Sequence, residues 1–354
     1  MTKRPGKIAV AISGGLDSCL AAALLKMQGW EVYGLHLVIP ASSLRFKRGL
    51  ARVKRISECL QIPLKVLDIE ETFESLIINP FIDAYLRGLT PNPCVMCNQL
   101  IKFEYLLHYA EQNNIQYIAT GHYVMTSREE GHPRVVLLRG KDRRKDQSYF
   151  LNRLSRTCLA KTLFPLGGMT KDEARHKAHE MDLPVQFIPE SQDICFLPDK
   201  DYRLFVEKQR GHGVNRPGNI IDEHGKILGE HNGAFRYTIG QRQGLGIASR
   251  RPYYVKEVRI DTDEIVVGRR EDIYSKEVEA GLFHWIGKVP SQKVVEKIDA
   301  QVRYRHLPAP GRLEITSLED IRFIFDEPQW AVTPGQALVC YEGDRVLGGG
   351  WIKK

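Results

Sequence analysis

One stretch near the N-terminus constrains the fold of this chain more than any other. Residues 8–12 form an apolar run that predicts a buried parallel strand, and residues 20–27 form a periodic apolar segment that predicts a helix. The turn between them is Ser13-Gly14-Gly15-Leu16-Asp17-Ser18. A strand, a glycine turn and a helix N-terminus aim backbone N–H groups at one point, which favours a bound phosphate. We therefore predict an α/β protein whose first loop binds a phosphate group.

The spacing of this loop separates it from the commoner phosphate loops. Neither G-x-x-x-x-G-K-[ST] nor G-x-G-x-x-G occurs here. Ser-Gly-Gly-x-Asp-Ser at residues 13–18 instead resembles the pyrophosphate loop of the ATP pyrophosphatases. That resemblance implies that ATP is split into AMP and pyrophosphate while a carbonyl oxygen is adenylated. The simpler interpretation is a glycine turn that only closes a strand–helix unit.

Strands and helices alternate along the first part of the chain. Strands are predicted at 31–38, 63–67 and 117–120, and helices at 73–86 and 98–111. This alternation predicts a doubly wound parallel sheet, in which ligands bind at the carboxyl ends of the strands. The phosphate loop, Leu37 and Gly121 all lie at such ends.

The pattern changes near residue 206. Before it, a capping box of Thr170 with Glu173 predicts one more helix, followed by a strand at 185–187. After it, short alternating strands are predicted at 253–260, 264–267, 297–304, 312–316, 321–325 and 337–341. We therefore predict an α/β catalytic domain at 1–205, a small central β-rich domain at 206–276 and a C-terminal β-barrel at 277–354.

The charge of the chain favours an anionic partner. Its 354 residues carry a formal net charge of +8. Basic residues cluster at 41–55 and at 139–145, and each cluster is either a nucleic-acid surface or a solvated face. The sequence has no apolar run of membrane-spanning length and no secretory signal, so we expect a cytoplasmic protein with no membrane partner.

The chain has seven cysteines, an odd number that argues against a disulfide framework. Four are predicted to be packing residues, namely Cys19, Cys59, Cys158 and Cys340. Cys94 and Cys97 form a C-x-x-C pair directly before a helix predicted from Asn98. A helix N-terminus lowers the pKa of a thiol, which makes Cys97 a candidate nucleophile. The C-x-x-C spacing also suits a metal ion or a dithiol.

Several ordered motifs, spread over nearly the whole chain, together resemble the tRNA-specific 2-thiouridylase family. They are the loop at 13–18, Thr90-Pro91-Asn92-Pro93 with Cys97-Asn98 and Ile101-Lys102-Phe103, Ala119-Thr120-Gly121-His122-Tyr123, Lys145-Asp146-Gln147-Ser148-Tyr149-Phe150, Ile194-Cys195-Phe196, Tyr237-Thr238-Ile239-Gly240-Gln241-Arg242, Arg303-Tyr304-Arg305 and Pro334-Gly335-Gln336. Other ATP pyrophosphatases share only the first of these. The resemblance implies ATP-dependent thiolation of C2 of the wobble uridine in the tRNA anticodon stem-loop.

The resemblance also implies a role for particular residues. ATP would be bound by Ala11, Ile12, Ser13, Gly14, Gly15, Leu16, Asp17, Ser18, Leu37 and Gly121. tRNA would be contacted by Asn92, Pro93, Cys94, His122, Lys145, Asp146, Gln147, Arg303, Tyr304 and Gln336. The central domain at 206–276 would be a tRNA-binding domain. Cys97 would be the nucleophile, and Cys195 would carry sulfur that comes from a donor protein or from free sulfide.

These residue types suit that chemistry. A uridine carbonyl is a poor electrophile, and adenylation of its oxygen makes AMP the leaving group. Loop N–H groups and a Mg²⁺ ion stabilise the charge that develops as pyrophosphate departs, and Asp17 orients the loop or this metal. A sulfur nucleophile then attacks C2 of a base drawn out of the anticodon stack.

The sequence departs from the family in two places. Many members have an aspartate where this chain has Cys94, so an acid/base role for that aspartate does not transfer. The segment after Leu37 is basic here, whereas it is acidic in many members.

Cys94, Cys97 and Cys195 supply three thiols, which suits a 4Fe–4S cluster with one open iron, an arrangement that resembles the cluster-dependent tRNA thiolases. We place this route ahead of a persulfide route, in which Cys97 attacks a persulfide on Cys195, releases sulfide and leaves a disulfide. In the simplest alternative Cys94 only replaces the aspartate. Two other functions stay open: another ATP pyrophosphatase, of amidotransferase or lysidine-forming type, and a non-catalytic RNA-binding protein with the same fold.

Overall fold

The chain folds into two compact units. A computed structural model describes residues 6–40, 43–128, 135–185, 194–197 and 201–353. The N-terminal unit comprises Met1–Leu76, Cys94–Pro198 and Asp344–Leu347, and the C-terminal unit comprises Ile77–Pro93, Asp199–Gly343 and Gly348–Lys354.

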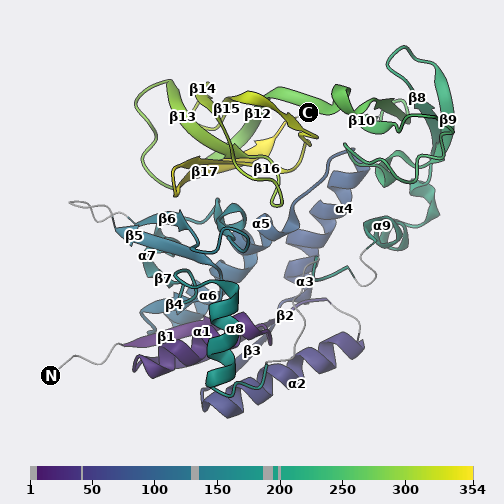
Figure 1. The fold of residues 1–354 in the computed structure, drawn as a ribbon. Helices are drawn as coiled ribbons and strands as arrows, with labels where there is room; N and C mark the ends of the chain where they lie inside the picture. The colour runs from purple at the N-terminus through teal and green to yellow at the C-terminus, as the bar shows by residue number, and fades with distance from the viewer. Residues whose placement is uncertain (1–5, 41–42, 129–134, 186–193, 198–200, 354) are drawn as a thin grey trace. The chain divides into compact units, whose positions relative to one another are not determined.

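A parallel sheet forms the centre of the N-terminal unit (Figure 1). Its strands are β1 (Lys7–Ala11), β2 (Glu31–Val38), β3 (Leu64–Asp68), β4 (Tyr117–Ala119) and β7 (Thr162–Leu163). They lie in the order β3-β2-β1-β4-β7, and every neighbouring pair is parallel. The predicted doubly wound sheet is therefore confirmed. Strand β7 has only two residues, too few for a hydrophobic pattern to reveal it.

Helices cover this sheet on both faces. The helices of this unit are α1 (Leu16–Met27), α2 (Ser43–Leu60), α3 (Glu70–Phe73), α5 (Pro93–Cys97), α6 (Phe103–Gln112), α7 (Arg156–Lys161) and α8 (Lys171–Glu180). Ile8 and Val10 of β1 belong to one buried cluster with residues of α1, α2 and α8, among them Leu20, Val53 and Ala174. Helix α6 also contacts β1, but its buried side chains lie outside that cluster, so it covers the opposite face.

The strand order places the predicted phosphate site at a topological switch point. Strand β2 pairs with β1 on one side, and β4 pairs with β1 on the other. The loop at 13–18 follows β1, and Gly121 follows β4, so both lie at carboxyl ends of neighbouring parallel strands. In doubly wound sheets, ligands bind at this position.

The N-terminal unit also contains an antiparallel hairpin that the sequence analysis does not predict. It consists of β5 (Val124–Arg128) and β6 (Val135–Arg139). Leu138 of β6 pairs in turn with Arg345, the first residue of β17 (Arg345–Ile352). Neither hairpin strand alternates strictly between apolar and polar residues, so the pattern used to predict strands is weak here.

Three local predictions are wrong. The helix predicted at 73–86 is not one regular α-helix, because it contains a π-helical segment, η1 (Glu74–Ile78), directly before α4 (Asn79–Leu86), and Pro80 lies in the first turn of α4. The helix predicted from Asn98 begins earlier, at Pro93, and continues through the π-helical segment η2 (Asn98–Lys102) into α6. Val185 lies in a turn, while residues 186–187 of that predicted strand lie outside the described residues.

A small sheet and a barrel make up most of the C-terminal unit, together with α4 and α9 (Tyr202–Arg210). The small sheet has the order β10-β11-β8-β9 and consists of β8 (Pro217–Ile221), β9 (Ile227–Asn232), β10 (Tyr254–Arg259) and β11 (Glu264–Gly268). The barrel consists of β12 (Tyr274–Trp285), β13 (Val294–Gln301), β14 (Ala309–Ile315), β15 (Ile321–Trp330), β16 (Ala337–Glu342) and β17. Because β12 pairs with both β15 and β17, the barrel is closed, as predicted.

Within the ranges that the structure describes, no helix combines the length and the apolar composition of a membrane-spanning segment.

Candidate functional site

The predicted phosphate loop has the geometry of an open anion site. Gly14 has a φ of +84°, in the left-handed region that favours glycine. The Ser18 hydroxyl accepts from the Ser13 N–H at 3.1 Å and donates to the Gly15 carbonyl at 3.1 Å, which fixes the turn. Helix α1 begins at Leu16, so the N–H groups of its first turn have no helical partners. Among the described residues, a side chain on Gly15 would approach only the Ser13 hydroxyl, at 3.6 Å, so the space beside it is open.

Gly121 holds the end of β4 against this loop. A Cβ there would lie 2.6 Å from the Asp17 carbonyl carbon and 2.8 Å from the Ser18 nitrogen, closer than backbone atoms allow. Ala11 ends β1, and half-buried Leu37 lies near the end of β2, which pairs with β1. The structure therefore brings the predicted ATP-binding residues together at one edge of the sheet.

Asp17 is held by two groups that the sequence analysis does not identify. The Lys171 ammonium lies 2.7 Å and 2.9 Å from the two carboxylate oxygens, and the Tyr123 hydroxyl donates to one of them at 2.8 Å. Lys171 is 4% exposed, so its charge is buried beside the loop. The capping box at Thr170 places Lys171 in the first turn of α8, where the helix dipole disfavours a cation. A lysine at that position is the sequence signal for a nearby carboxylate.

The three cysteines singled out by the sequence come close together in the N-terminal unit. Burial, with added repulsion from Cys97 and Cys94, raises the pKa of the Cys195 thiol to about 12. Burial likewise raises the pKa of Cys94 to about 11, with a smaller effect of Cys97, and it raises the pKa of Cys97 itself. These repulsions put the three thiols within electrostatic range of one another. Cys195 is nevertheless an exposed residue, which leaves one side of it accessible to a sulfur donor.

The predicted lowering of the Cys97 pKa is therefore wrong. The helix begins at Pro93, so Cys97 lies at the end of α5 and not beside the free N–H groups of a helix N-terminus. Desolvation is the largest effect on this thiol, and it raises the pKa.

The other cysteines mostly behave as predicted. Cys19, Cys158 and Cys340 are buried packing residues, whereas Cys59, near the end of the amphipathic helix α2, is exposed and is not a packing residue.

Aromatic packing positions Cys195. Its neighbour Phe196 is 5% exposed and meets buried Phe73 of α3 edge to face, with ring centroids 5.8 Å apart. Such a pair adds about 1 kcal/mol to the contribution of its buried area. The Leu197 N–H donates to the Ile194 carbonyl at 3.2 Å, which closes a turn around Cys195.

Lys102 connects the thiols with the end of β4. Its charge lowers the pKa of Cys97, against the larger effect of burial. Burial lowers the pKa of His122 well below its usual range, and Lys102 adds to that shift. Since His122 directly follows Gly121, one cation acts on residues of both halves of the candidate site. Its ammonium also donates to the Asn98 Oδ1 at 2.8 Å, which holds it in place.

The described residues do not supply the ligand set that a 4Fe–4S cluster needs. No three His, Cys, Asp or Glu side chains among them are arranged to hold a metal ion. The arrangement therefore gives the predicted cluster no support.

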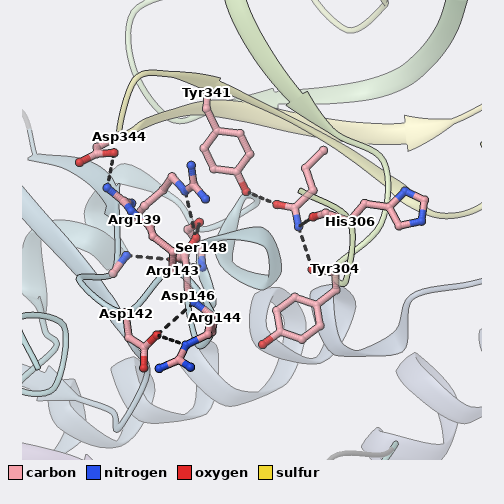
Figure 2. A network of polar contacts seen from close by, with 12 residues as sticks. Arg139, Asp142, Arg143, Arg144, Asp146, Ser148, Tyr304, His306, Tyr341 and Asp344 are labelled. Atoms are coloured by element: carbon pink, nitrogen blue, oxygen red, sulfur yellow. Dashed lines mark hydrogen bonds and ion pairs between the residues drawn. The ribbon is translucent and has the colours of Figure 1, made fainter. Parts of the chain in front are cut away.

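Two predicted tRNA contacts are buried within the N-terminal unit. The Asp146 carboxylate accepts from the Gly140 N–H at 2.9 Å and from the Ser148 hydroxyl at 2.7 Å (Figure 2). The buried His122 ring lies 2.7 Å from the Thr120 hydroxyl. In this structure both side chains hold the fold together.

Gln147 is placed differently. It is half-buried, its Oε1 accepts from the Tyr123 N–H at 2.9 Å, and its amide nitrogen makes no hydrogen bond within the described part of the chain. The same Tyr123 binds Asp17, so Gln147 lies beside the phosphate-loop half of the site.

The basic cluster at 139–145 is mostly neutralised within its own unit. Three of its ion pairs are Arg139–Asp146, Arg143–Asp344 and Arg144–Asp142 (Figure 2). A fourth joins Lys141 to Glu173. These partners favour the interpretation of this cluster as a solvated face. Lys145 is half-buried, and its N–H donates to the Asp142 carbonyl at 3.0 Å.

In the C-terminal unit, Gln336 fixes the backbone that leads to Asn92. Its amide nitrogen donates to the Thr90 carbonyl at 2.8 Å and to the Pro91 carbonyl at 3.3 Å. Asn92 and Pro93, which follow, are both buried. Gln336 therefore acts on the Pro-Asn-Pro segment from within the fold.

Arg303 and Tyr304 lie in a tightly bonded loop that follows β13. Arg303 donates to the Ala331 carbonyl at 2.9 Å and to the Thr333 hydroxyl at 2.6 Å. The Tyr304 carbonyl accepts from the Gln301 amide at 2.8 Å, while the Tyr304 ring stays half-buried (Figure 2).

Comparisons with known proteins match the chain over almost its full length. The family models described as tRNA methyl transferase HUP domain, tRNA methyl transferase PRC-barrel domain and aminomethyltransferase beta-barrel domain match residues 6–199, 205–269 and 275–352. A protein named tRNA-specific 2-thiouridylase MnmA from Geotalea uraniireducens is 44% identical over 98% of this chain and 95% of its own length. Proteins of that name from Carboxydothermus hydrogenoformans and Geobacter metallireducens are 42% and 43% identical, over 98% and 99% of this chain and 98% of their own lengths.

Proposed function

The chain belongs to the tRNA-specific 2-thiouridylase MnmA family, and from this premise we propose that it thiolates C2 of the wobble uridine of tRNA at the expense of ATP. The observation that carries the proposal is the arrangement of the N-terminal unit, where a phosphate loop held by Lys171 lies in the same unit as three neighbouring thiols. The RNA part bound is the anticodon stem-loop, and the sulfur comes from a donor protein. The domains are those at 1–205, 206–276 and 277–354.

The first step is adenylation of the uridine. ATP lies with its adenine near Leu37 and its phosphates at the N-terminus of α1. The uridine O2 attacks the α-phosphate, and pyrophosphate leaves. Loop N–H groups and the Lys171 ammonium stabilise the charge that gathers on the pyrophosphate. The Asp17 carboxylate has the oxygen chemistry that Mg²⁺ prefers, and the ion would supply further charge neutralisation there.

The second step is sulfur transfer. Cys195 carries a persulfide, and the Cys97 thiolate attacks its inner sulfur. Hydrosulfide leaves and attacks C2 of the adenylated uridine, and AMP departs with the former O2. The Cys97–Cys195 disulfide is then reduced by an external thiol. Lys102 favours the Cys97 thiolate that this step needs.

This route is preferred to the cluster route because the described residues supply no cluster ligand set. The experiment combines iron analysis with activity. Protein purified without oxygen and treated with a chelator is assayed for 2-thiouridine with unmodified tRNA, ATP, Mg²⁺ and a persulfide donor. We expect full thiolation by the iron-free protein.

Two other outcomes would overturn parts of the proposal. About four irons per chain, lost together with activity in Cys94→Ala, would establish the cluster route. AMP formation that depends on tRNA but yields no 2-thiouridine would instead indicate another ATP pyrophosphatase.

A further inference from the structure

A basic cavity in the C-terminal unit lies outside the site described above. It has a volume of about 690 Å³ and is lined by Arg203, Arg236, Tyr237, Gln241, Arg242, Gln243 and Gly244. Three arginines and no acidic residue line it, so the cavity favours an anion. Its volume falls within the range of about 300–1,000 Å³ typical of ligand sites.

Two of the arginines are fixed in advance. The Arg203 Nε donates to the Arg236 carbonyl at 2.7 Å, and its terminal nitrogen donates to the Gln241 Oε1 at 3.2 Å. Arg236 pairs with Glu207 at 2.7 Å and with the Asn215 Oδ1 at 2.9 Å. These contacts hold the guanidinium groups in place without filling the cavity, which reduces the entropy that a ligand would lose on binding.

Arg242 differs from both. It is exposed, and it makes no ion pair or hydrogen bond to another residue in the described part of the chain. Its loop is nevertheless fixed, because the Gln241 N–H donates to the Thr238 carbonyl at 3.0 Å and the Val255 N–H donates to the Gln241 carbonyl at 2.9 Å. A cation held beside two others is repelled by them until an anion binds.

We propose that this cavity binds a phosphodiester group of tRNA together with its nucleotide, with Arg242 as the principal contact. The assignment rests on the proposed function, which makes tRNA the polyanion at hand. Guanidinium groups bind phosphate oxygens in pairs, and the Tyr237 ring with the glutamine amides suits a base or ribose. A free mononucleotide carries the same chemistry, so the test separates the two.

The test compares two single-charge variants. Arg242→Gln removes the principal contact, and Arg250→Gln removes another exposed arginine of the same unit, one that does not line the cavity. Binding of unmodified tRNA is measured by fluorescence anisotropy over a range of salt concentrations, in a Cys97→Ser background so that no turnover occurs. We expect Arg242→Gln to bind about tenfold more weakly with a salt slope lower by about one, and Arg250→Gln to stay within about twofold.

Three outcomes would overturn the assignment. Equal losses of tRNA affinity in both variants would indicate a general charge effect. Unchanged tRNA affinity of Arg242→Gln would show that the cavity does not bind RNA. Competition of AMP or inorganic phosphate with tRNA at this site, abolished by Arg242→Gln, would place a free nucleotide or phosphate there. Failure of the proposed function is distinct, because it would show as the absence of 2-thiouridine formation by the wild-type protein, whatever the two variants bind. Unchanged thermal unfolding of both variants confirms that they fold.

Discussion

The two halves of the candidate site differ in how far the fold prepares them for reaction. In the phosphate loop, Lys171 and Tyr123 hold Asp17 in place, and the space beside Gly15 is open. Among the thiols, burial raises the pKa of Cys94, Cys97 and Cys195, so each is protonated near neutral pH. Preorganised groups stabilise charge without moving, whereas a thiol reacts only as thiolate. Under the proposed mechanism, the fold itself would prepare the activation of ATP, while the activation of sulfur would depend on substrate or donor binding.

The largest expected effect is the loss of 2-thiouridine formation in a Cys97 variant that still releases pyrophosphate. Cys97→Ser should lower 2-thiouridine formation by about 10³-fold or more, because a hydroxyl cannot attack the persulfide. Pyrophosphate release that depends on tRNA should stay within a few-fold, since the phosphate loop is untouched. Mass spectrometry of the tRNA and a pyrophosphate assay measure the two steps, with Cys59→Ser, an exposed cysteine, as the matched control. Loss of both steps in Cys97→Ser would contradict the separation of the site into a phosphate-loop half and a thiol half.

The next largest effect concerns the phosphate-loop half of the site. Lys171→Met removes the cation that holds Asp17, and we expect pyrophosphate release to fall about 100-fold, as when one transition-state donor is lost. The effect stays below that of a fully buried pair because the Asp17 side chain is 36% exposed. Lys171→Arg keeps the charge and should recover at least half of this loss on a logarithmic scale. A rise in KM for ATP, with the rate at saturation unchanged, would contradict a role in the reaction itself.

The sequence predicts the two halves unequally well, and for a physical reason. The phosphate loop is local, so its six residues determine the turn, and the strand pattern determines which edge of the sheet it meets. Lys171 is 154 positions from Asp17, and only the folded chain brings them together, although a lysine in the first turn of α8 hints at a partner. The pKa of Cys97 depends on packing around it, and desolvation reversed the shift that the helix alone predicts.

A third prediction concerns the thiol half of the site and tests how Lys102 affects Cys97. Lys102→Met removes the charge that lowers the pKa of Cys97, so that pKa should rise further. Because alkylation requires the thiolate, its rate increases as pH rises toward the pKa, and at pH 8 the variant should react about three- to tenfold more slowly. Site-resolved mass spectrometry after iodoacetamide treatment measures the rate at Cys97. Lys102→Arg should match the wild-type protein. Faster alkylation of Lys102→Met would contradict the inference that the charge of Lys102 lowers the pKa of Cys97.

The smallest effect tests the residue that departs from the family. Near neutral pH Cys94 is protonated, since its pKa is about 11, so Cys94→Ala removes no charge and should change thiolation by iron-free protein less than about threefold. Cys94→Asp should lower the reactivity of the Cys195 thiol. A carboxylate beside Cys195 raises the pKa of that thiol above its present value of about 12 and slows its alkylation and its loading with sulfur. A tenfold or greater loss in Cys94→Ala, with alkylation of Cys195 unchanged, would give Cys94 a direct part in sulfur transfer.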